Sequence, residues 1–262
     1  MRFPFGALLL MFAFQLPAHA ENVIVLNSAD ASVSLIDEAT QKEVDTFPVG
    51  KEPHHLMATP DNQSLIVANS VANNLVFLDP KSGKVQRWVP DIEDPYQLGF
   101  SYDRKWFVTN RLRLDRVDIY HYDGKNVTLA KRVPLSAMPS HMIFSADNKI
   151  VFVTLQVSGE VDKGAHNFRS LVDGQHILVS NRVGNTISIL DQNSLTNVGT
   201  ITGLLPGPDD MELTPDKRYL WVTFRFTRYV GIIDMKTLKL VNTIKVGKSP
   251  HGIYFYNRAP LV

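Results

Sequence analysis

IVLN at residues 24–27 returns as IVAN at 66–69, FVTN at 107–110 and LVSN at 178–181. Two variants occupy the same place in the pattern, FVTL at 152–155 and WVTF at 221–224. Successive copies lie about 42 residues apart where the spacing is regular. Self-similarity at a fixed period of this size is typical of propellers and other repeat architectures.

Each repeat unit is predicted to contain four short strands and no helix. Val, Ile, Phe and Leu are dense in the apolar segments, and helical periodicity is absent. In the second unit the expected strands are 56–59, 64–69, 75–79 and 85–89. Thr59-Pro60-Asp61-Asn62 suits a tight turn, because proline fixes φ and aspartate bonds to nearby backbone. Four strands per unit of about 42 residues predict an all-β protein with the β-propeller fold.

The two ends of the repeat array are predicted to share one blade. The array begins at Val23 with what matches a second strand, and it ends with PHGIYF at 250–255, which matches a first strand. We therefore expect the C-terminal strand to join the N-terminal blade and close the ring.

One of the repeats is shorter than the others. First-strand segments begin near residues 55, 97, 141, 167, 210 and 252, which gives six blade positions. The turn aspartates Asp147 and Asp173 are only 26 residues apart, well short of one period. We expect a fourth blade (141–161) that lacks its outer two strands, because of an internal deletion near 161/162.

The first twenty residues are expected to be a signal peptide and not part of the fold. Arg2 precedes an apolar stretch, and Ala18-His19-Ala20 is a small-x-small cleavage signal. Cleavage after Ala20 would leave a single domain, 21–262, with no membrane span, in the periplasm or secreted. The chain has no cysteine, which excludes thiolate chemistry and c-type haem, and its net charge of +1 demands no nucleic acid or anionic membrane.

One face of the predicted propeller is rich in histidine and arginine. The loop before each first strand and the loop between second and third strands share this face, beside the central channel. The first-strand starts contribute His54, His55, Tyr96, Gln97, Ser140, His141, His166, Asn167, Asp209, Asp210 and His251. The other loops contribute Arg111, Arg113, Arg182, Arg225 and Arg228.

This face predicts a pocket for an anionic ligand, because arginine forks suit carboxylate and phosphate and imidazole binds metals. The candidate ligand-binding residues are His54, His55, Arg111, His141, His166, Arg182, Asp209, Asp210, Arg225 and His251. Candidate ligands of a metal or haem iron, approaching the axis from four blades, are His54, His141, His166 and His251.

Each of these residues also has a structural interpretation. Pro-His is a way for this repeat to begin a strand, with the imidazole bonded to the backbone of a neighbouring blade. Asp209 and Asp210 either pair with Arg182 and Arg225 or help to hold a divalent cation. The repeated turn aspartates carry turn chemistry and are given no catalytic role.

The Asn-ending segments, the Pro-His segments and the Thr-Pro-Asp turns resemble the YVTN-type β-propeller repeat proteins. The resemblance covers essentially all of 21–256. Relatives of that repeat include YncE-like periplasmic proteins, surface proteins and the haem-bearing propellers of nitrite reductases. It implies seven blades as the usual number, and binding of single-stranded DNA in YncE-like relatives.

Several functions remain open on the sequence. There is no Gly-x-Ser-x-Gly elbow, Walker loop or His-Glu-x-x-His motif. This favours a non-catalytic binding or scaffold protein that holds a small anionic ligand or a periplasmic protein on the His/Arg-rich face. The alternatives are a haem- or metal-binding propeller and a propeller lactonase-type hydrolase, so a haem or a divalent metal stays open as cofactor.

Overall fold

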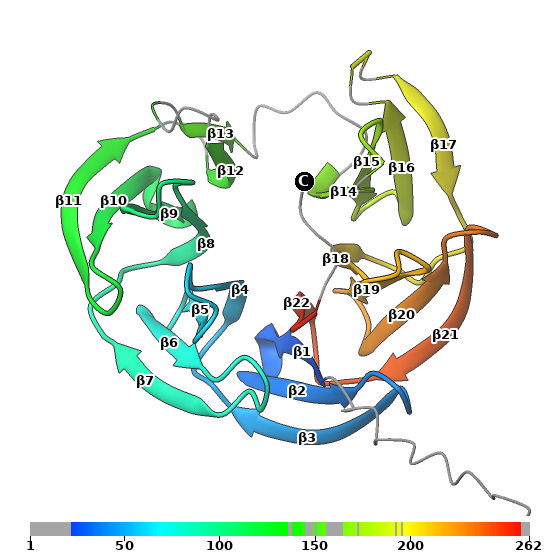
Figure 1. Ribbon diagram of the computed structural model, residues 1–262, viewed down its shortest axis with the longest axis horizontal. Coiled ribbons are helices and arrows are strands. Elements are labelled where there is room, and N and C mark those ends of the chain that lie inside the picture. The colour runs from blue at the N-terminus through cyan, green and yellow to red at the C-terminus, as the bar shows by residue number, and fades with distance from the viewer. Residues whose placement is uncertain are drawn as a thin grey trace, which may run out of the picture.

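The computed structural model consists of five four-stranded antiparallel sheets and one two-stranded sheet around a common centre (Figure 1). It describes residues 22–257 except 136–137, 145–148, 150, 156–164, 172, 192 and 195. The protein is thus an all-β propeller with four-stranded blades, as the repeat predicts. In the described residues, no helix has the length and apolar character needed to cross a membrane.

The strands of each blade follow one another from the centre outward (Figure 1). The first blade contains β22 (Pro250–Phe255), β1 (Asn22–Asn27), β2 (Ser32–Asp37) and β3 (Lys42–Pro48). The second contains β4 (Pro53–Ala58), β5 (Leu65–Asn69), β6 (Asn74–Leu78) and β7 (Val85–Val89). The third contains β8 (Pro95–Phe100), β9 (Trp106–Arg111), β10 (Arg116–Tyr122) and β11 (Val127–Pro134).

The rest of the ring follows in chain order. The two-stranded sheet pairs β12 (Pro139–Phe144) with β13 (Val151–Leu155). The next blade contains β14 (Ala165–Ser170), β15 (His176–Asn181), β16 (Thr186–Asp191) and β17 (Asn197–Ile201). The last contains β18 (Pro208–Leu213), β19 (Tyr219–Phe224), β20 (Tyr229–Asp234) and β21 (Lys239–Lys245). Short 3-10 turns lie at Ser28–Asp30 and Leu112–Leu114.

The number of blades differs from the sequence prediction. The structure has five four-stranded blades, one fewer than the six blade positions counted from first-strand segments. The segment expected to form the fourth blade supplies only the two-stranded sheet β12–β13, because no third or fourth strand follows β13 in the described residues before β14 begins. The expected deletion point, 161/162, lies outside the described residues, as does the expected signal peptide.

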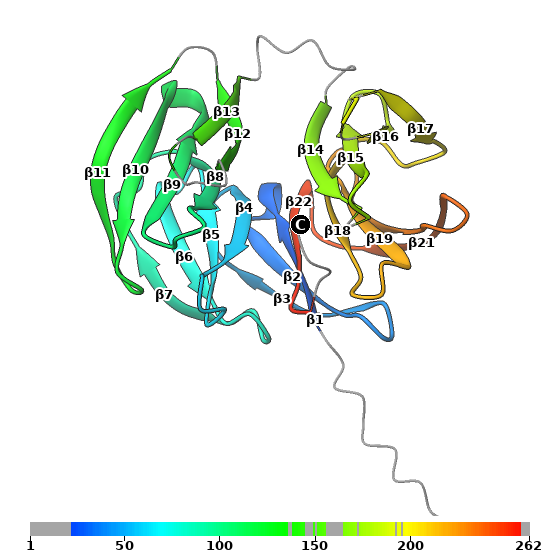
Figure 2. The same cartoon turned by 45° about the horizontal axis from the view of Figure 1, so that its top comes forward.

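The predicted closure of the ring is confirmed. β22 pairs with β1 in antiparallel register, with Val23 opposite Phe255 and Val25 opposite Ile253. Figure 2 shows β22 beside β1 in the tilted view as well. Hydrogen bonds between the two ends of the described chain therefore remove what would otherwise be an open seam.

The recurring asparagine has a structural explanation. Asn27, Asn69, Asn110 and Asn181 are all fully buried where the second strand ends. Asn181 Nδ2 donates to Thr186 Oγ1 at 3.0 Å and to Ser188 Oγ at 2.9 Å, which joins the turn to the third strand. The side chain of Asn69 also fills the space beside Gly50, where a Cβ would lie 2.6 Å from Asn69 Nδ2. The asparagine therefore recurs because its side chain packs in the turn that follows the second strand.

The hydrophobic core is divided among the contacts between neighbouring sheets. Val23, Val25 and Ile36 of the first blade pack against Trp221 and Val230 of the last blade. Similar clusters join the other neighbours. None of the five clusters found among the described residues joins the sheet β12–β13 to β14–β17. Among the described residues, apolar packing therefore joins each pair of neighbouring sheets except β12–β13 and β14–β17.

Candidate functional site

A β-bulge in every first strand positions the side chains at the channel. In β4, Pro53 lies opposite Asn69 and His55 lies opposite Ala68, so the chain gains one residue against β5. The same irregularity occurs in β8, β12, β14, β18 and β22. A bulge of this kind re-aims side chains and is common next to functional sites. The second and third residues of each first strand are therefore the ones that the fold turns toward the channel.

The bulges bring together a set of residues that we call the channel cluster. Its members are His54, Tyr96, His141, His166, Arg182, Asp209, Asp210, Arg225 and His251. Five of their rings form a row that crosses from blade to blade. Ring centroids lie 3.6 Å apart for Tyr96 and His54, 3.8 Å for His54 and His251, 5.5 Å for His251 and His166, and 4.8 Å for His166 and His141.

Asp209 is the centre of this cluster. It is fully buried, and its Oδ1 lies 2.9 Å from His166 Nε2 and 3.3 Å from His251 Nε2. Arg182 Nη2 lies 2.9 Å from Asp209 Oδ2. Arg225 is more distant, with Nε 4.0 Å from the same oxygen. The predicted pairing with both arginines is therefore present for Asp209, whereas the ion pair that Asp210 forms among the described residues is with His251.

Asp210 is held by polar groups of two other blades. Asn167 Nδ2 donates to its Oδ1 at 2.5 Å, and its Oδ2 lies 3.6 Å from His251 Nδ1. The Asp210 backbone N–H, which the bulge frees from the ladder, donates to Thr223 Oγ1 at 3.0 Å. The carboxylate is therefore fixed in position from both its side chain and its backbone.

The electrostatics of the cluster favour charged carboxylates. Burial would raise the pKa of Asp209, but His166, His251 and Arg182 hold it well below its ordinary value. Burial likewise opposes ionisation of Asp210, yet the neighbouring His251 lowers its pKa to about 2. Burial lowers the pKa of His251, although the two carboxylates oppose this effect. At neutral pH the two arginines thus balance the two aspartates.

Several buried polar atoms in the cluster lack a partner among the described residues. They are Arg182 Nε, Arg225 Nη1, Asp209 Oδ2 and both ring nitrogens of His251. The ring nitrogens of His251 lie near the carboxylates of Asp209 and Asp210 without hydrogen-bond geometry. His251 is 1% exposed, so bulk water does not satisfy it. Buried polar groups without partners are rare in folded proteins and indicate a bound water, ion or ligand.

Two of the predicted histidines bond to a neighbouring blade. His54 Nδ1 lies 3.2 Å from the carbonyl oxygen of Tyr96, and Leu98 N–H donates to His55 Nδ1 at 3.4 Å. These contacts match the structural interpretation of the Pro-His segments. Burial, with smaller effects from His251 and Arg225, lowers the pKa of His54 well below its ordinary value. His54 therefore stacks in the cluster as a neutral ring.

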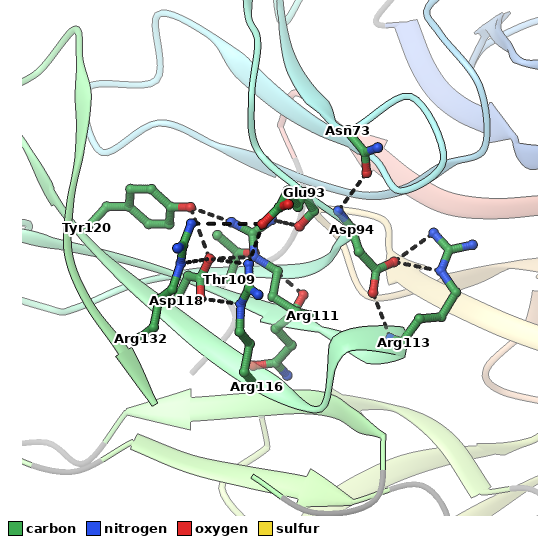
Figure 3. A network of polar contacts seen from close by, with 11 residues as sticks. Asn73, Glu93, Asp94, Thr109, Arg111, Arg113, Arg116, Asp118, Tyr120 and Arg132 are labelled. Carbon is green, nitrogen blue, oxygen red and sulfur yellow. Dashed lines mark hydrogen bonds and ion pairs between the residues drawn. The ribbon is translucent and has the colours of Figure 1, made fainter. Parts of the chain in front are cut away.

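Arg111 belongs to a different network, which Figure 3 shows from close by. It is fully buried, and its Nε lies 3.1 Å from Asp118 Oδ2 in the same blade. Its other nitrogens donate to the Tyr120 hydroxyl and the Glu93 carbonyl oxygen. The structure thus places this predicted ligand-binding residue in the blade interior. Of the two other arginines expected on the face, Arg113 pairs with Asp94 and Arg228 lies near Asp30.

Tyr96 and Asn167 lie on the face predicted from the sequence, but they are not among the candidate ligand-binding residues. Tyr96 is 7% exposed, and its ring stacks on that of His54. Burial raises its pKa to about 12, so the phenol stays protonated. Both residues occupy the first-strand positions that hold histidine or aspartate in other blades. That shared position is the signal that identifies them.

A cavity of about 300 Å³ lies next to the cluster inside the ring. Asp210 borders it, together with apolar side chains that include Met57, Phe100, Met142 and Met211. Glu212 also borders it and forms a buried ion pair with Arg169, whose Nε is 2.7 Å from Glu212 Oε1. The cavity lies at the small end of the range for ligand pockets.

The cluster fits a single metal ion better than a haem. His166, Asp209, Asp210 and His251 each offer one ligand atom, and these atoms lie within 4.8 Å of one another. His54 and His141, the other two predicted metal ligands, are not in this group. A haem would have to separate rings that now pack against each other, such as His54 and His251 at 3.8 Å. The described residues therefore do not fit a haem at these histidines.

Comparison with known proteins agrees with the fold. Residues 10–163 and 160–261 match the sequence model of the YNCE-like beta-propeller family. No sequence among curated proteins matches the chain.

Many solved structures are similar to the chain, and three of them are given as examples. The dihydro-heme d1 dehydrogenase NirN in complex with DHE is 14% identical, with a TM-score of 0.66 over 91% of this chain and 75% of the other. The periplasmic gluconolactonase PpgL of Pseudomonas aeruginosa is 17% identical, with a TM-score of 0.57 over 91% and 88%. Hydrazine synthase of Kuenenia stuttgartiensis is 17% identical, with a TM-score of 0.54 over 90% and 89%. At these identities the likeness shows the fold alone.

Proposed function

We propose that this chain, which belongs to the YNCE-like β-propeller family, is a binding protein that holds a small anionic ligand at the channel cluster without catalysing a reaction on it. The ligand would carry a carboxylate or a phosphate. A protein partner that presents such a group would use the same residues.

The observation that carries this proposal is the arrangement of Arg182 and Arg225 around Asp209. Asp209 is fully buried, whereas the two arginine side chains keep 15% and 19% of their surface exposed. The arginine side chains are therefore more accessible to an incoming ligand than the carboxylate of Asp209. Each arginine also has one nitrogen without a partner among the described residues, Arg182 Nε and Arg225 Nη1. Such donors suit carboxylate or phosphate oxygens.

Titration calorimetry with inorganic phosphate and with succinate tests the proposal. We expect one ligand per chain for at least one of these probes, and at least tenfold weaker binding in Arg225→Ala. Arg228→Ala is the matched control, because Arg228 lies in the same loop but is half exposed and faces Asp30. Absence of heat with both probes, or equal affinity in the two variants, would reject an anion site at this cluster.

We infer that the mature protein is one domain, 21–262, exported to the periplasm or secreted. The apolar stretch after Arg2 and the Ala18-His19-Ala20 signal support export. Mass spectrometry of the protein from a periplasmic fraction should give a chain that begins at Glu21. A mass that includes Met1 or Arg2 would contradict cleavage.

We also infer that β12–β13 is the remnant of a further blade whose outer two strands were lost near 161/162. The register of β12 supports this, because Pro139 lies opposite Leu155 and Met142 opposite Val153, the bulge found in every other first strand. Inserting a copy of residues 186–201 after residue 161 should raise the thermal unfolding temperature if two strands are missing there. A lower temperature would argue against a remnant blade.

A further inference from the structure

His166, Asp209, Asp210 and His251 form a set of donors that suits a transition-metal dication. Two imidazoles and two carboxylates are a common combination for zinc and its neighbours, with bonds of about 2.0–2.2 Å. All four residues are buried, and one ligand atom from each lies within 4.8 Å of all the others. A contraction of the cluster would therefore bring the four atoms onto one ion.

A second observation points to a ligand at the same place. His251 is 1% exposed, and neither of its ring nitrogens has a hydrogen-bond partner among the described residues. The burial of this ring and the two carboxylates around it exclude a purely apolar role. A metal ion between Asp209, Asp210 and His251 would satisfy the imidazole and both acids at once.

Arg182 now occupies the position of a cation in this cluster. Its Nη2 contacts His166 Nε2 and lies 2.9–3.0 Å from the two oxygens of Asp209. His166 Nε2 also lies 2.9 Å from Asp209 Oδ1, so the imidazole and the guanidinium converge on the same carboxylate. Arg182 therefore fills the place between His166 and Asp209 that a metal ion would take.

We propose that the channel cluster is a divalent transition-metal site in which Arg182 serves as the internal cation until a metal ion displaces it. His166, Asp209, Asp210 and His251 would be the ligands. Asn167 is a positioning residue, because its Nδ2 donates to Asp210 Oδ1 and leaves Oδ2 for the metal. The side chain of Arg182 is 15% exposed, so other groups do not enclose it on all sides.

This proposal uses the same cluster as the proposed anion site, but it makes the opposite prediction for Arg182. Removing a guanidinium that binds the anion should weaken phosphate binding. Removing a guanidinium that competes with the metal should tighten metal binding. The Arg182→Gln variant therefore separates the two ideas, since one can fail while the other holds.

The test is titration of the EDTA-treated, dialysed protein with Zn²⁺ and with Co²⁺, followed by calorimetry and by the visible spectrum of the bound Co²⁺. We expect one ion per chain. Asp210→Asn and His251→Ala should each weaken binding at least tenfold, and Arg182→Gln should strengthen it at least tenfold. His176→Gln is the control, because His176 forms an exposed pair with Asp173 outside the cluster and its loss should leave the affinity unchanged.

Folding of each variant is checked by circular dichroism before titration. Asp210→Asn keeps the shape of the side chain, so it tests the site even if His251→Ala does not fold. Less than one equivalent of metal in the unsubstituted protein would overturn the proposal. So would an unchanged affinity in Asp210→Asn, or weaker metal binding in Arg182→Gln.

Discussion

Arg182 and Asp209 form an ion pair across the junction of two neighbouring blades, with Arg182 Nη2 2.9 Å from Asp209 Oδ2. Arg182 follows β15, and Asp209 is the second residue of β18. The aspartate is fully buried, so its charge depends on partners that other strands deliver. Loss of either residue should therefore disturb both the channel cluster and the packing between these two blades.

The first prediction concerns the loss of this counter-ion. Asp209→Asn should lower the free energy of unfolding by about 3–5 kcal/mol, because it leaves Arg182 largely buried without its carboxylate. Urea unfolding followed by tryptophan fluorescence measures the change. The double variant Asp209→Asn/Arg182→Gln should recover part of the loss. If the double variant loses as much unfolding free energy as the two single variants together, the two residues do not act as a pair.

The second prediction concerns the strand that closes the ring. Phe255 is 1% exposed, and its ring meets that of Trp221 edge-on with centroids 5.1 Å apart. Phe255→Ala should cost about 3–5 kcal/mol of unfolding free energy, because it opens a cavity between the first and last blades.

Val44→Ala is the matched control for Phe255→Ala. Val44 lies on β3 of the same blade but is 55% exposed, so the change should stay within about 0.5 kcal/mol. Urea unfolding of both variants decides the point. Equal effects would mean that the closing strand contributes little to stability.

The fold was predictable because the repeat marks local structure. Asn27 and Asn181 occupy the same place in two repeats and make the same hydrogen bond to a serine of the third strand. The closing strand matches the first-strand pattern of the other blades. Such features depend on residues within one blade. They can therefore be recognised from one unit and extended to the next.

The candidate site was predictable only in part, because it depends on contacts between blades. Arg111 and Arg182 each follow the recurring asparagine, and the sequence treats them alike. Arg111 pairs with Asp118 of its own blade, whereas Arg182 pairs with Asp209 of the next. Spacing does not reveal which acid is nearer. Nor does it reveal the bulge that turns His54 and Tyr96 toward each other.

The third prediction concerns a turn aspartate and pH. Asp61 Oδ1 accepts from Thr59 Oγ1 at 2.6 Å and from the Gln63 backbone N–H at 3.0 Å. These bonds, with that of Thr59 first, lower the pKa of Asp61. A lowered folded-state pKa adds stability above the unfolded value of 3.8, and this is lost as pH falls through the folded-state value.

Asp61→Asn keeps an acceptor but cannot ionise. It should therefore be less stable than the unsubstituted protein by about 0.5–1 kcal/mol at pH 7, with this difference in stability narrowing as the pH falls below 3.8. Urea unfolding across this range measures it. The exposed Asp45→Asn serves as control, with a change of less than about 0.5 kcal/mol. A gap for Asp61→Asn that stays constant with pH would contradict the assignment.

The last prediction is that the polar network shown in Figure 3 stabilises the fold and does not bind the ligand. Asp118 is 1% exposed and lies 3.1 Å from Arg111, 3.0 Å from Arg116 and 3.7 Å from Arg132. Arg111→Ala should lower the free energy of unfolding by about 3–5 kcal/mol, because it removes the fully buried partner of a buried acid. Arg132→Ala should change it by no more than about 1 kcal/mol, since that side chain is 54% exposed.

Phosphate affinity is the second measurement on the Arg111→Ala variant. It should equal that of the unsubstituted protein under conditions where both are folded, because Arg111 contacts Asp118, Tyr120 and the backbone of residue 93 instead of the channel cluster. Arg225→Ala should show the reverse, weaker phosphate binding with a smaller effect on stability, because Arg225 lies 4.0 Å from Asp209 and is partly exposed. Weaker phosphate binding in Arg111→Ala would instead place the ligand between these two groups of arginines.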